Sequence, residues 1–142
     1  MNLIREALDA ICQAYAIGDM YVFGSRKQEI SAYIDKGATN PLPSTADVDI
    51  GIFPKKEEIW EPEKRVNLTI ELEDLFRASR VDLLLLPEVD SYLALDIIRG
   101  ELIYTDDPDR QARYELYVLR RAADLFPFKK DRIRMILEEG AR

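Results

Sequence analysis

The stretch DVDIGIF at residues 47–53 decides the fold class. It alternates aspartate or glycine with valine or isoleucine, and this period of two predicts a strand with one apolar face. Alternate residues of a strand share a face, so Asp47 and Asp49 point the same way, with Cα atoms about 6.5–7 Å apart. The pair is either a solvated part of a strand or a cation site, since neighbouring carboxylates repel each other unless water or a positive ion lies between them.

Helical and strand patterns alternate on both sides of this stretch. Proline, glycine and aspartate at the expected element ends support the boundaries. The run at residues 81–86 is almost continuously apolar, which predicts a strand buried on both faces, and Pro127 is expected to break the last long helix. We therefore expect a short helix early in residues 26–46, longer helices at about 3–18, 62–76, 90–100, 108–126 and 127–140, and strands at 20–23, 47–53, 81–86 and 101–105.

This order of elements is typical of a single domain of the α/β (α+β) class, with a mixed sheet of about four to five strands flanked by helices. The length of 142 residues fits one domain with its own core. No internal repeat or low-complexity tract divides the sequence. We assign residues 1–126 to the domain and residues 127–142 to a C-terminal helical extension of the same domain.

Histidine is absent from the sequence, and Cys12 is its one cysteine. The composition therefore excludes Ser-His and Cys-His dyads, disulfide frameworks and the common zinc sites. Catalysis has to use carboxylates, hydroxyls, lysine, arginine or tyrosine, together with a metal that prefers oxygen ligands. A lone cysteine also agrees with a reducing compartment, and we expect a cytoplasmic protein.

The net charge of −7 is unevenly distributed. Residues 1–109 carry 11 Lys and Arg against 22 Asp and Glu, whereas residues 110–142 carry 9 against 5. An acidic body argues against direct nucleic-acid binding. The basic C-terminal stretch is either a solvated helix face or a surface that docks a partner, with Arg132 and Arg134 as its test residues. No apolar run approaches the roughly 18 residues of a membrane span, so we expect no membrane association.

Gly24-Ser25 follows a strand and opens a helical turn. Such a turn presents backbone N–H groups to an anion, and a glycine lets a phosphate approach closely. Ser25 adds a hydroxyl donor and Arg26 adds positive charge. The dipeptide is also common in plain turns, so by itself it indicates a phosphate site only weakly.

Asp82 interrupts the apolar run at residues 81–86. An ionised carboxylate in an apolar strand is costly to desolvate and needs a partner. That partner is either a nearby arginine, Arg80 or Arg77, or a cation shared with Asp47 and Asp49 on a neighbouring strand. A phosphate-binding turn, two metal carboxylates and a third acid together are the equipment for metal-assisted phosphoryl or nucleotidyl transfer.

These residues resemble the nucleotidyltransferase superfamily that contains DNA polymerase beta and kanamycin nucleotidyltransferase. The likeness is strongest to the minimal nucleotidyltransferases (MNT), the antitoxin partners of HEPN-domain toxins. It rests on YVFGSR at residues 21–26, ADVDIGI at 46–52 and RVDLLL at 80–85, and it extends over roughly residues 2–125. The resemblance implies a single-domain nucleotidyltransferase fold for residues 1–126.

The resemblance also implies an activity. Such a protein would use Mg²⁺, or alternatively Mn²⁺, to transfer AMP from ATP to an acceptor hydroxyl. In the antitoxin type this hydroxyl belongs to a tyrosine of the HEPN toxin, which the antitoxin also binds directly. A homo-oligomer stays open. The nucleotide would be bound by Gly24, Ser25 and Arg26, and the metal and catalytic site would consist of Asp47, Asp49 and Asp82.

Residues 26–46 depart from the family pattern, because these 21 residues between Ser25 and Asp47 exceed the usual spacing. A loop tolerates such an insertion thermodynamically, so the departure affects the choice of acceptor more than the fold. Two other functions stay open. One is a binding module that neutralises its partner by occlusion. The other is a transferase for small molecules such as aminoglycosides, although 142 residues leave little room for a further acceptor-binding domain.

Overall fold

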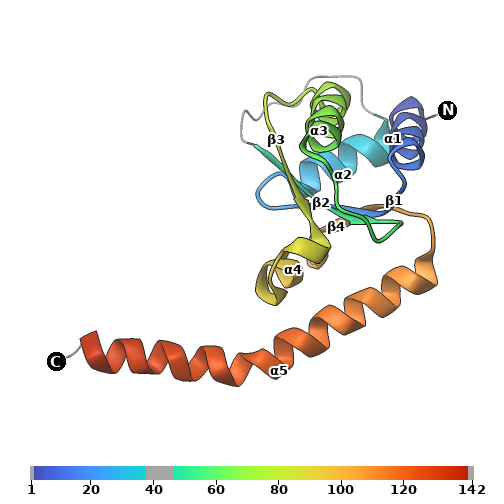
Figure 1. Cartoon of the computed structure of the whole chain (residues 1–142). Helices are drawn as coiled ribbons and strands as arrows, with labels where there is room; N and C mark the ends of the chain where they lie inside the picture. Colours follow the sequence, from blue (N-terminus) through green and yellow to red (C-terminus); the bar gives the residue numbers. More distant parts are fainter. Residues whose placement is uncertain (1, 38–46, 141–142) are drawn as a thin grey trace.

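The computed structural model describes residues 2–37 and 47–140, with side chains up to residue 125. Helices and strands follow one another in the expected order (Figure 1). The elements are α1 (Leu3–Ala14), β1 (Ile17–Phe23), α2 (Lys27–Lys36), β2 (Val48–Pro54), α3 (Pro62–Phe76), β3 (Val81–Leu85), the short 3-10 turn η1 (Leu86–Glu88), α4 (Ser91–Ile98), β4 (Glu101–Thr105) and α5 (Pro108–Gly140).

The four strands of the described chain form one mixed sheet in the order β3-β2-β1-β4. β1 runs antiparallel to both β2 and β4, while β2 and β3 run parallel. A parallel pair needs a long crossover, and α3 supplies it. The expected α+β class and the expected number of strands are therefore confirmed.

Helices cover both faces of this sheet (Figure 1). α1, α2 and α3 pack against one face around the larger group of buried apolar side chains, and α4 and α5 pack against the other. The alternation in β2 produces this division, because Val48, Ile50 and Ile52 are fully buried in the first layer. Gly51 lies under Ile97 of α4 on the opposite face. Asp49 consequently belongs to the α4 and α5 side of the sheet.

The predicted end of the first helix is wrong by about four residues. α1 ends at Ala14, and β1 already begins at Ile17. Ala16 has a positive φ of 52°, and this left-handed residue turns the chain sharply into the sheet. Gly18 is therefore a strand residue, not a helix terminator. Strand pairing with β2 and β4 overrides the helical spacing of the apolar residues that precede it.

The prediction that residues 81–86 are buried on both faces is only partly correct, because side chains pack on both faces but the middle of the strand is half-buried. β3 lies at an edge of the sheet, and its three middle residues are half-buried. Only the two ends, Val81 and Leu85, are buried. The continuous apolar run reflects packing against α3 and α4 on the two faces, while one long side of the strand has no neighbouring strand among the described residues.

Pro127 does not end the last helix. α5 runs continuously from Pro108 to Gly140, and Figure 1 shows it passing across the sheet and continuing beyond it. A proline inside a helix removes one backbone hydrogen bond and bends the axis, but the turns on either side persist. Residues 38–46 of the lengthened segment 26–46 and the side chains of Arg132 and Arg134 lie outside the described residues.

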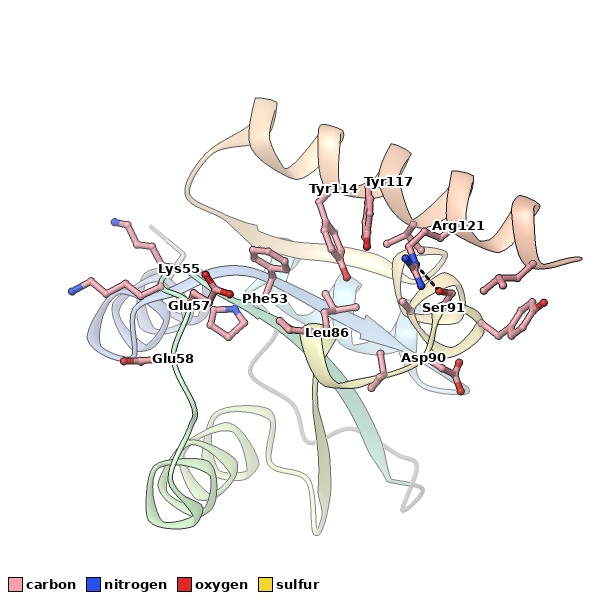
Figure 2. Close-up of a pocket in the computed structure, with 18 residues that line it drawn as sticks. Phe53, Lys55, Glu57, Glu58, Leu86, Asp90, Ser91, Tyr114, Tyr117 and Arg121 are labelled. Atoms are coloured by element: carbon pink, nitrogen blue, oxygen red, sulfur yellow. Dashed lines mark hydrogen bonds between the residues drawn. The ribbon is translucent and has the colours of Figure 1, made fainter.

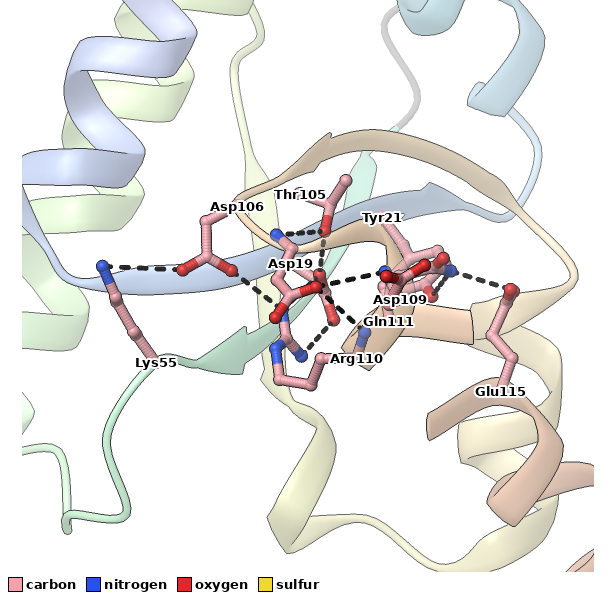
Figure 3. Close-up of polar contacts among 10 residues, drawn as sticks. Asp19, Tyr21, Lys55, Thr105, Asp106, Asp109, Arg110, Gln111 and Glu115 are labelled. Atoms are coloured by element: carbon pink, nitrogen blue, oxygen red, sulfur yellow. Dashed lines mark hydrogen bonds and ion pairs between the residues drawn. The ribbon is translucent and has the colours of Figure 1, made fainter. Parts of the chain in front are cut away.

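A buried ion pair fixes the start of α5 on the sheet (Figure 3). Asp19 of β1 is fully buried and accepts hydrogen bonds from Nη1 and Nη2 of Arg110 at 2.9 and 2.8 Å. Thr105 of β4 donates its hydroxyl to the same carboxylate at 2.7 Å. One residue further on, Gln111 donates from Nε2 to the Tyr21 hydroxyl at 2.7 Å. We call Asp19, Thr105 and Arg110 the α5 clamp.

Candidate active site

Asp49 occupies the centre of the candidate site. In the strand register its Cα is paired with Phe23, the last residue of β1, on one side and with Asp82 of β3 on the other. Asp47 immediately precedes β2, and alternation places it on the same face as Asp49. The structure thus brings the three predicted acids to adjacent strands at one end of the sheet.

Gly24 is in direct contact with Asp49. Its φ is +77°, and a Cβ atom added there would lie 2.2 Å from Oδ2 of Asp49. A side chain at this position would therefore both strain the backbone and displace the carboxylate. The Gly24-Ser25 turn is exposed and leads directly into α2. The two sequence segments that predicted the site meet here, although more than twenty residues separate them.

Arg26 is positioned differently from the solvent-facing cation that a phosphate site would use. Its side chain is only 3% exposed, and its Nε and Nη2 donate to the carboxylate of Glu29 at 3.1 and 3.4 Å. Arg26 is also the N-cap residue of α2, where it makes no side-chain capping hydrogen bond. The N-terminus of this ten-residue helix therefore has no capping hydrogen bond from the Arg26 side chain. Ser25, the residue directly before Arg26, is exposed to solvent.

Arg80 lies between two of the predicted acids. Its Nε is 3.0 Å from Oδ1 of Asp82 and 3.7 Å from Oδ2 of Asp47. All three side chains are substantially exposed, at 68%, 39% and 45% for Arg80, Asp82 and Asp47. Such solvent-exposed pairs are worth about 0–1 kcal/mol, so displacement of the arginine by a bound cation would cost little. Of the two partners considered for Asp82, Arg80 is present.

Asp49 is electrostatically strained by its neighbours. Burial raises the pKa of its carboxyl, and the negative charges of Asp82 and Asp47 raise it further. The nearby Arg80 is engaged with the other two acids. A cation bound next to Asp49 would relieve this repulsion.

A cleft of about 650 Å³ opens beside the acids. Asp49, Asp82 and Phe23 form one part of its lining. The rest consists of α3 side chains that the sequence reasoning missed and of apolar residues from β3, namely Arg65, Val66, Thr69, Ile70, Glu73, Val81, Leu83 and Leu84. Val66 and Ile70 are large apolar residues four positions apart, so they share one face of α3. In the structure this face is exposed while the opposite face is buried, and the spacing of the two residues was the signal for this wall that the sequence contained.

The donor chemistry of the three acids fits Mg²⁺ or Mn²⁺, which prefer carboxylate oxygens. In the side-chain positions described here, no three His, Cys, Asp or Glu residues converge closely enough to hold a metal ion. The reason is visible in the ion pairs, since the carboxylates of Asp47 and Asp82 are turned toward Arg80. Rotation of these two exposed side chains toward Asp49 would complete an oxygen-only ligand set.

A second, larger cavity of about 1030 Å³ lies between the end of β2, η1, α4 and α5 (Figure 2). Phe53 and Tyr114, whose rings are 4.6 Å apart, contribute to its aromatic wall, and Arg121 donates to the Ser91 hydroxyl at its rim. None of the predicted site residues lines it. Of the predicted site residues, Asp49 and Asp82 line the smaller cleft instead.

Three comparisons with known proteins bear on this site. The chain matches the family model Polymerase beta, Nucleotidyltransferase over residues 6–109. No curated protein matches the chain in sequence. The matched range includes the Gly24-Ser25 turn and all three acids.

Solved structures extend the likeness to most of the chain. One is a toxin-antitoxin complex with AMP-PNP, whose matching chain is 13% identical, with a TM-score of 0.70 and coverage of 94% of this chain and 98% of that one. Another is the tri-AMPylated Shewanella oneidensis HEPN toxin in complex with MNT antitoxin, at 13% identity, a TM-score of 0.67 and coverage of 95% and 97%. A MntA-HepT toxin-antitoxin structure has 11% identity, a TM-score of 0.61 and full coverage of both chains.

At such low identity the solved structures establish the fold and nothing more. The family assignment rests on the family model, which spans more than half of the sequence and contains every predicted site residue. The described residues contain no helix that is both long and apolar enough to cross a lipid bilayer. The chain belongs to the polymerase beta nucleotidyltransferase family.

Proposed function

We propose that this protein is a Mg²⁺-dependent nucleotidyltransferase that transfers AMP from ATP to an acceptor hydroxyl, namely a tyrosine of a HEPN-type toxin that it neutralises. One observation carries the proposal. Gly24 approaches Asp49 so closely that no side chain fits between them, while Asp82 lies in register beside Asp49 on β3. A phosphate-binding turn and two carboxylates are thereby adjacent, as nucleotidyl transfer requires.

The start of α2 is assigned to the triphosphate. Backbone N–H groups at a helix N-terminus attract anions, and Ser25 is exposed where it can donate its hydroxyl. The glycine allows the phosphate chain to approach the backbone. Arg26 is assigned a supporting role, because its burial and its contact with Glu29 hold the turn in place.

Asp47, Asp49 and Asp82 are assigned to the metal. When bound, Mg²⁺ supplies positive charge that offsets the phosphates and the departing pyrophosphate. The raised pKa of Asp49 supports this assignment, since a cation among the acids removes the repulsion that raises it. Arg80 then leaves Asp47 and Asp82, a change that costs little because the pairs are exposed.

The transfer itself balances without a redox partner. The acceptor oxygen forms a bond to the α-phosphorus of ATP, and the bond from that phosphorus to the bridging oxygen breaks. Pyrophosphate leaves with the electron pair. The acceptor proton passes to a carboxylate, for which Asp82 is placed at the outer side of the site on the edge strand.

The toxin as acceptor is supported by the solved structures of similar fold. One of these complexes contains AMP-PNP, and in another the HEPN toxin is AMPylated and bound to an MNT antitoxin. These are properties of those proteins. They make a HEPN-type protein encoded beside this chain the first acceptor to test.

The test is an AMP-transfer assay with α-labelled ATP, Mg²⁺ and that HEPN-type protein. We expect label on a toxin tyrosine with the wild-type protein and loss of label by at least 100-fold in Asp47→Asn/Asp49→Asn. Glu101→Gln serves as the control, because it removes an exposed acid on β4 that does not line the cleft. No transfer with the wild-type protein, or equal transfer with the double variant, would contradict the catalytic proposal.

Toxin neutralisation in cells separates catalysis from occlusion. The proposal predicts that the double variant no longer neutralises the toxin, although it still folds. Full neutralisation by the double variant would support a binding module that acts by covering its partner. Transfer of AMP to an aminoglycoside but to no protein would support the small-molecule alternative.

A further inference from the structure

Each edge strand of the sheet has a backbone group that is bound by a side chain. On β4, Arg5 donates from Nη1 to the Ile103 carbonyl. On β3, the Val81 N–H donates to the Glu73 carboxylate at 3.1 Å, but no hydrogen bond from the described residues reaches the N–H or C=O of Leu83. Free backbone groups on an edge strand are a template for pairing with another chain.

The strand register shows which backbone groups face outward. Val48 of β2 donates its N–H to the Arg80 carbonyl at 3.0 Å, so Arg80 turns its backbone toward β2. Neighbouring residues of a strand alternate in this direction, so Asp82 and Leu84 also face β2. Val81 and Leu83 therefore present their N–H and C=O groups to the open side.

The candidate cleft follows this open side. Its α3 wall carries Val66 and Ile70, which are 56% and 50% exposed although both are large apolar side chains. Its β3 wall includes Leu83, and its lining reaches Asp82 and Asp49. An apolar groove beside free backbone groups is thus continuous with the acids assigned to catalysis.

We propose that β3 binds the acceptor segment of the substrate protein as an added fifth strand, so that the acceptor is a tyrosine within an extended peptide. This inference rests on the proposed function for the identity of the reacting group. The peptide backbone pairs with the N–H and C=O of Leu83, which no hydrogen bond from the described residues reaches. Such strand addition obtains affinity from the main chain and specificity from alternate side chains.

Alternation within the added strand gives the proposal a sequence signature. Side chains on the acid-bearing face meet Asp82 and Asp49, and the tyrosine belongs there. The residues directly before and after it point to the other face, toward the apolar groove with Val66 and Ile70. We therefore expect apolar residues on both sides of the acceptor tyrosine.

A second copy of this chain is the competing occupant. The net charge of −7 opposes pairing of two copies, because identical acidic proteins repel one another. A substrate segment, by contrast, has to enter the cleft in order to reach Asp49. Continuity between the groove and the catalytic acids therefore favours the acceptor.

The test uses an array of nine-residue peptides with a fixed central tyrosine, probed with the full-length protein in the absence of ATP. Leu83→Pro removes the outward N–H without removing a bond to β2. Ile70→Lys places a charge in the groove. Asn67→Lys is the matched control, because Asn67 is exposed on α3 but does not line the cleft.

We expect the retained peptides to be enriched in apolar residues next to the tyrosine. Leu83→Pro and Ile70→Lys should weaken the binding of such a peptide at least tenfold, whereas Asn67→Lys should change it less than twofold. Peptide binding should also protect the Leu83 amide from hydrogen exchange. Equal loss in Ile70→Lys and Asn67→Lys, or unchanged AMP transfer to the toxin in both groove variants, would overturn the inference.

Two further outcomes keep this inference separable from the proposed function. Peptide binding with the expected preference but no AMP transfer to any protein supports the docking strand and overturns the catalytic proposal. The docking proposal is overturned if the wild-type protein sediments as a dimer, Leu83→Pro dissociates this dimer, and the array retains no peptide. That result would show that a second copy of the chain occupies the edge.

Discussion

Replacement of Arg110 by methionine tests whether the α5 clamp holds the helix on the sheet. Asp19 is fully buried, and Arg110 provides two of its three hydrogen bonds. The carboxylate and Asp106 in turn raise the pKa of the Arg110 guanidinium further above its ordinary value, so the arginine stays charged at every working pH. In Arg110→Met, Asp19 keeps only the Thr105 hydroxyl as a donor.

The expected loss follows from this geometry. Removal of one partner from a buried ion pair costs about 3–5 kcal/mol because the other charge is stranded. Since the Arg110 side chain is 28% exposed, water reaches part of the site, and we expect about 3 kcal/mol. For a domain of this size that corresponds to a fall in Tm of roughly 10 °C.

Urea unfolding and thermal unfolding of Arg110→Met measure this loss. The double variant Asp19→Asn/Arg110→Met removes the stranded charge, and we expect it to recover more than half of the stability. A loss below about 1 kcal/mol, or a double variant no more stable than the single one, would refute the clamp as a buried charge pair.

Three further predictions concern the candidate site. Gly24→Ala should abolish detectable AMP transfer and cost about 1–2 kcal/mol, because alanine at φ +77° is strained and its Cβ would displace the Asp49 carboxylate; normal activity in this variant would contradict the site geometry. Asp49→Asn should stabilise the metal-free protein by roughly 0.5–1 kcal/mol at pH 7, since it removes a like charge directly opposite Asp82. The pH dependence of this gain in stability follows from the raised pKa of Asp49. Because the folded state holds the Asp49 proton more tightly than the unfolded state, ionisation of Asp49 destabilises the fold at high pH. The gain from Asp49→Asn should therefore disappear in thermal melts as the pH falls toward the ordinary value of 3.8. Mg²⁺ affinity, measured by calorimetry, should weaken as the pH falls through the same range by up to about tenfold per pH unit, and a pH-independent affinity would exclude Asp49 as a ligand.

Much of the candidate site was predictable because its signals are local. The period of two at residues 47–53 requires a strand with both acids on one face, whatever packs around it. A glycine between a strand and a helix indicates a tight turn with exposed N–H groups. These patterns involve neighbours in sequence, and the described structure preserves both of them.

Other features were not predictable because they depend on strand order. The apolar run in β3 suggests burial on both faces, but only the sheet order reveals that one long side of the strand is open. Arg80 was one of two arginines considered for Asp82, and the structure pairs it with both Asp82 and Asp47. The α3 wall of the cleft required the crossover between β2 and β3.

Composition alone restricts the side-chain chemistry that is available to this protein. Without histidine and with one cysteine, the chain has only oxygen ligands and cationic side chains available, and short-range periodicity places its acids on strands. Tertiary structure decided which of these groups meet. Gly24 and Asp49 are in contact because β1 and β2 pair, and Asp82 joins them because β3 adds parallel to β2. Contacts of this kind depend on long-range strand pairing, which residue spacing along the chain does not encode.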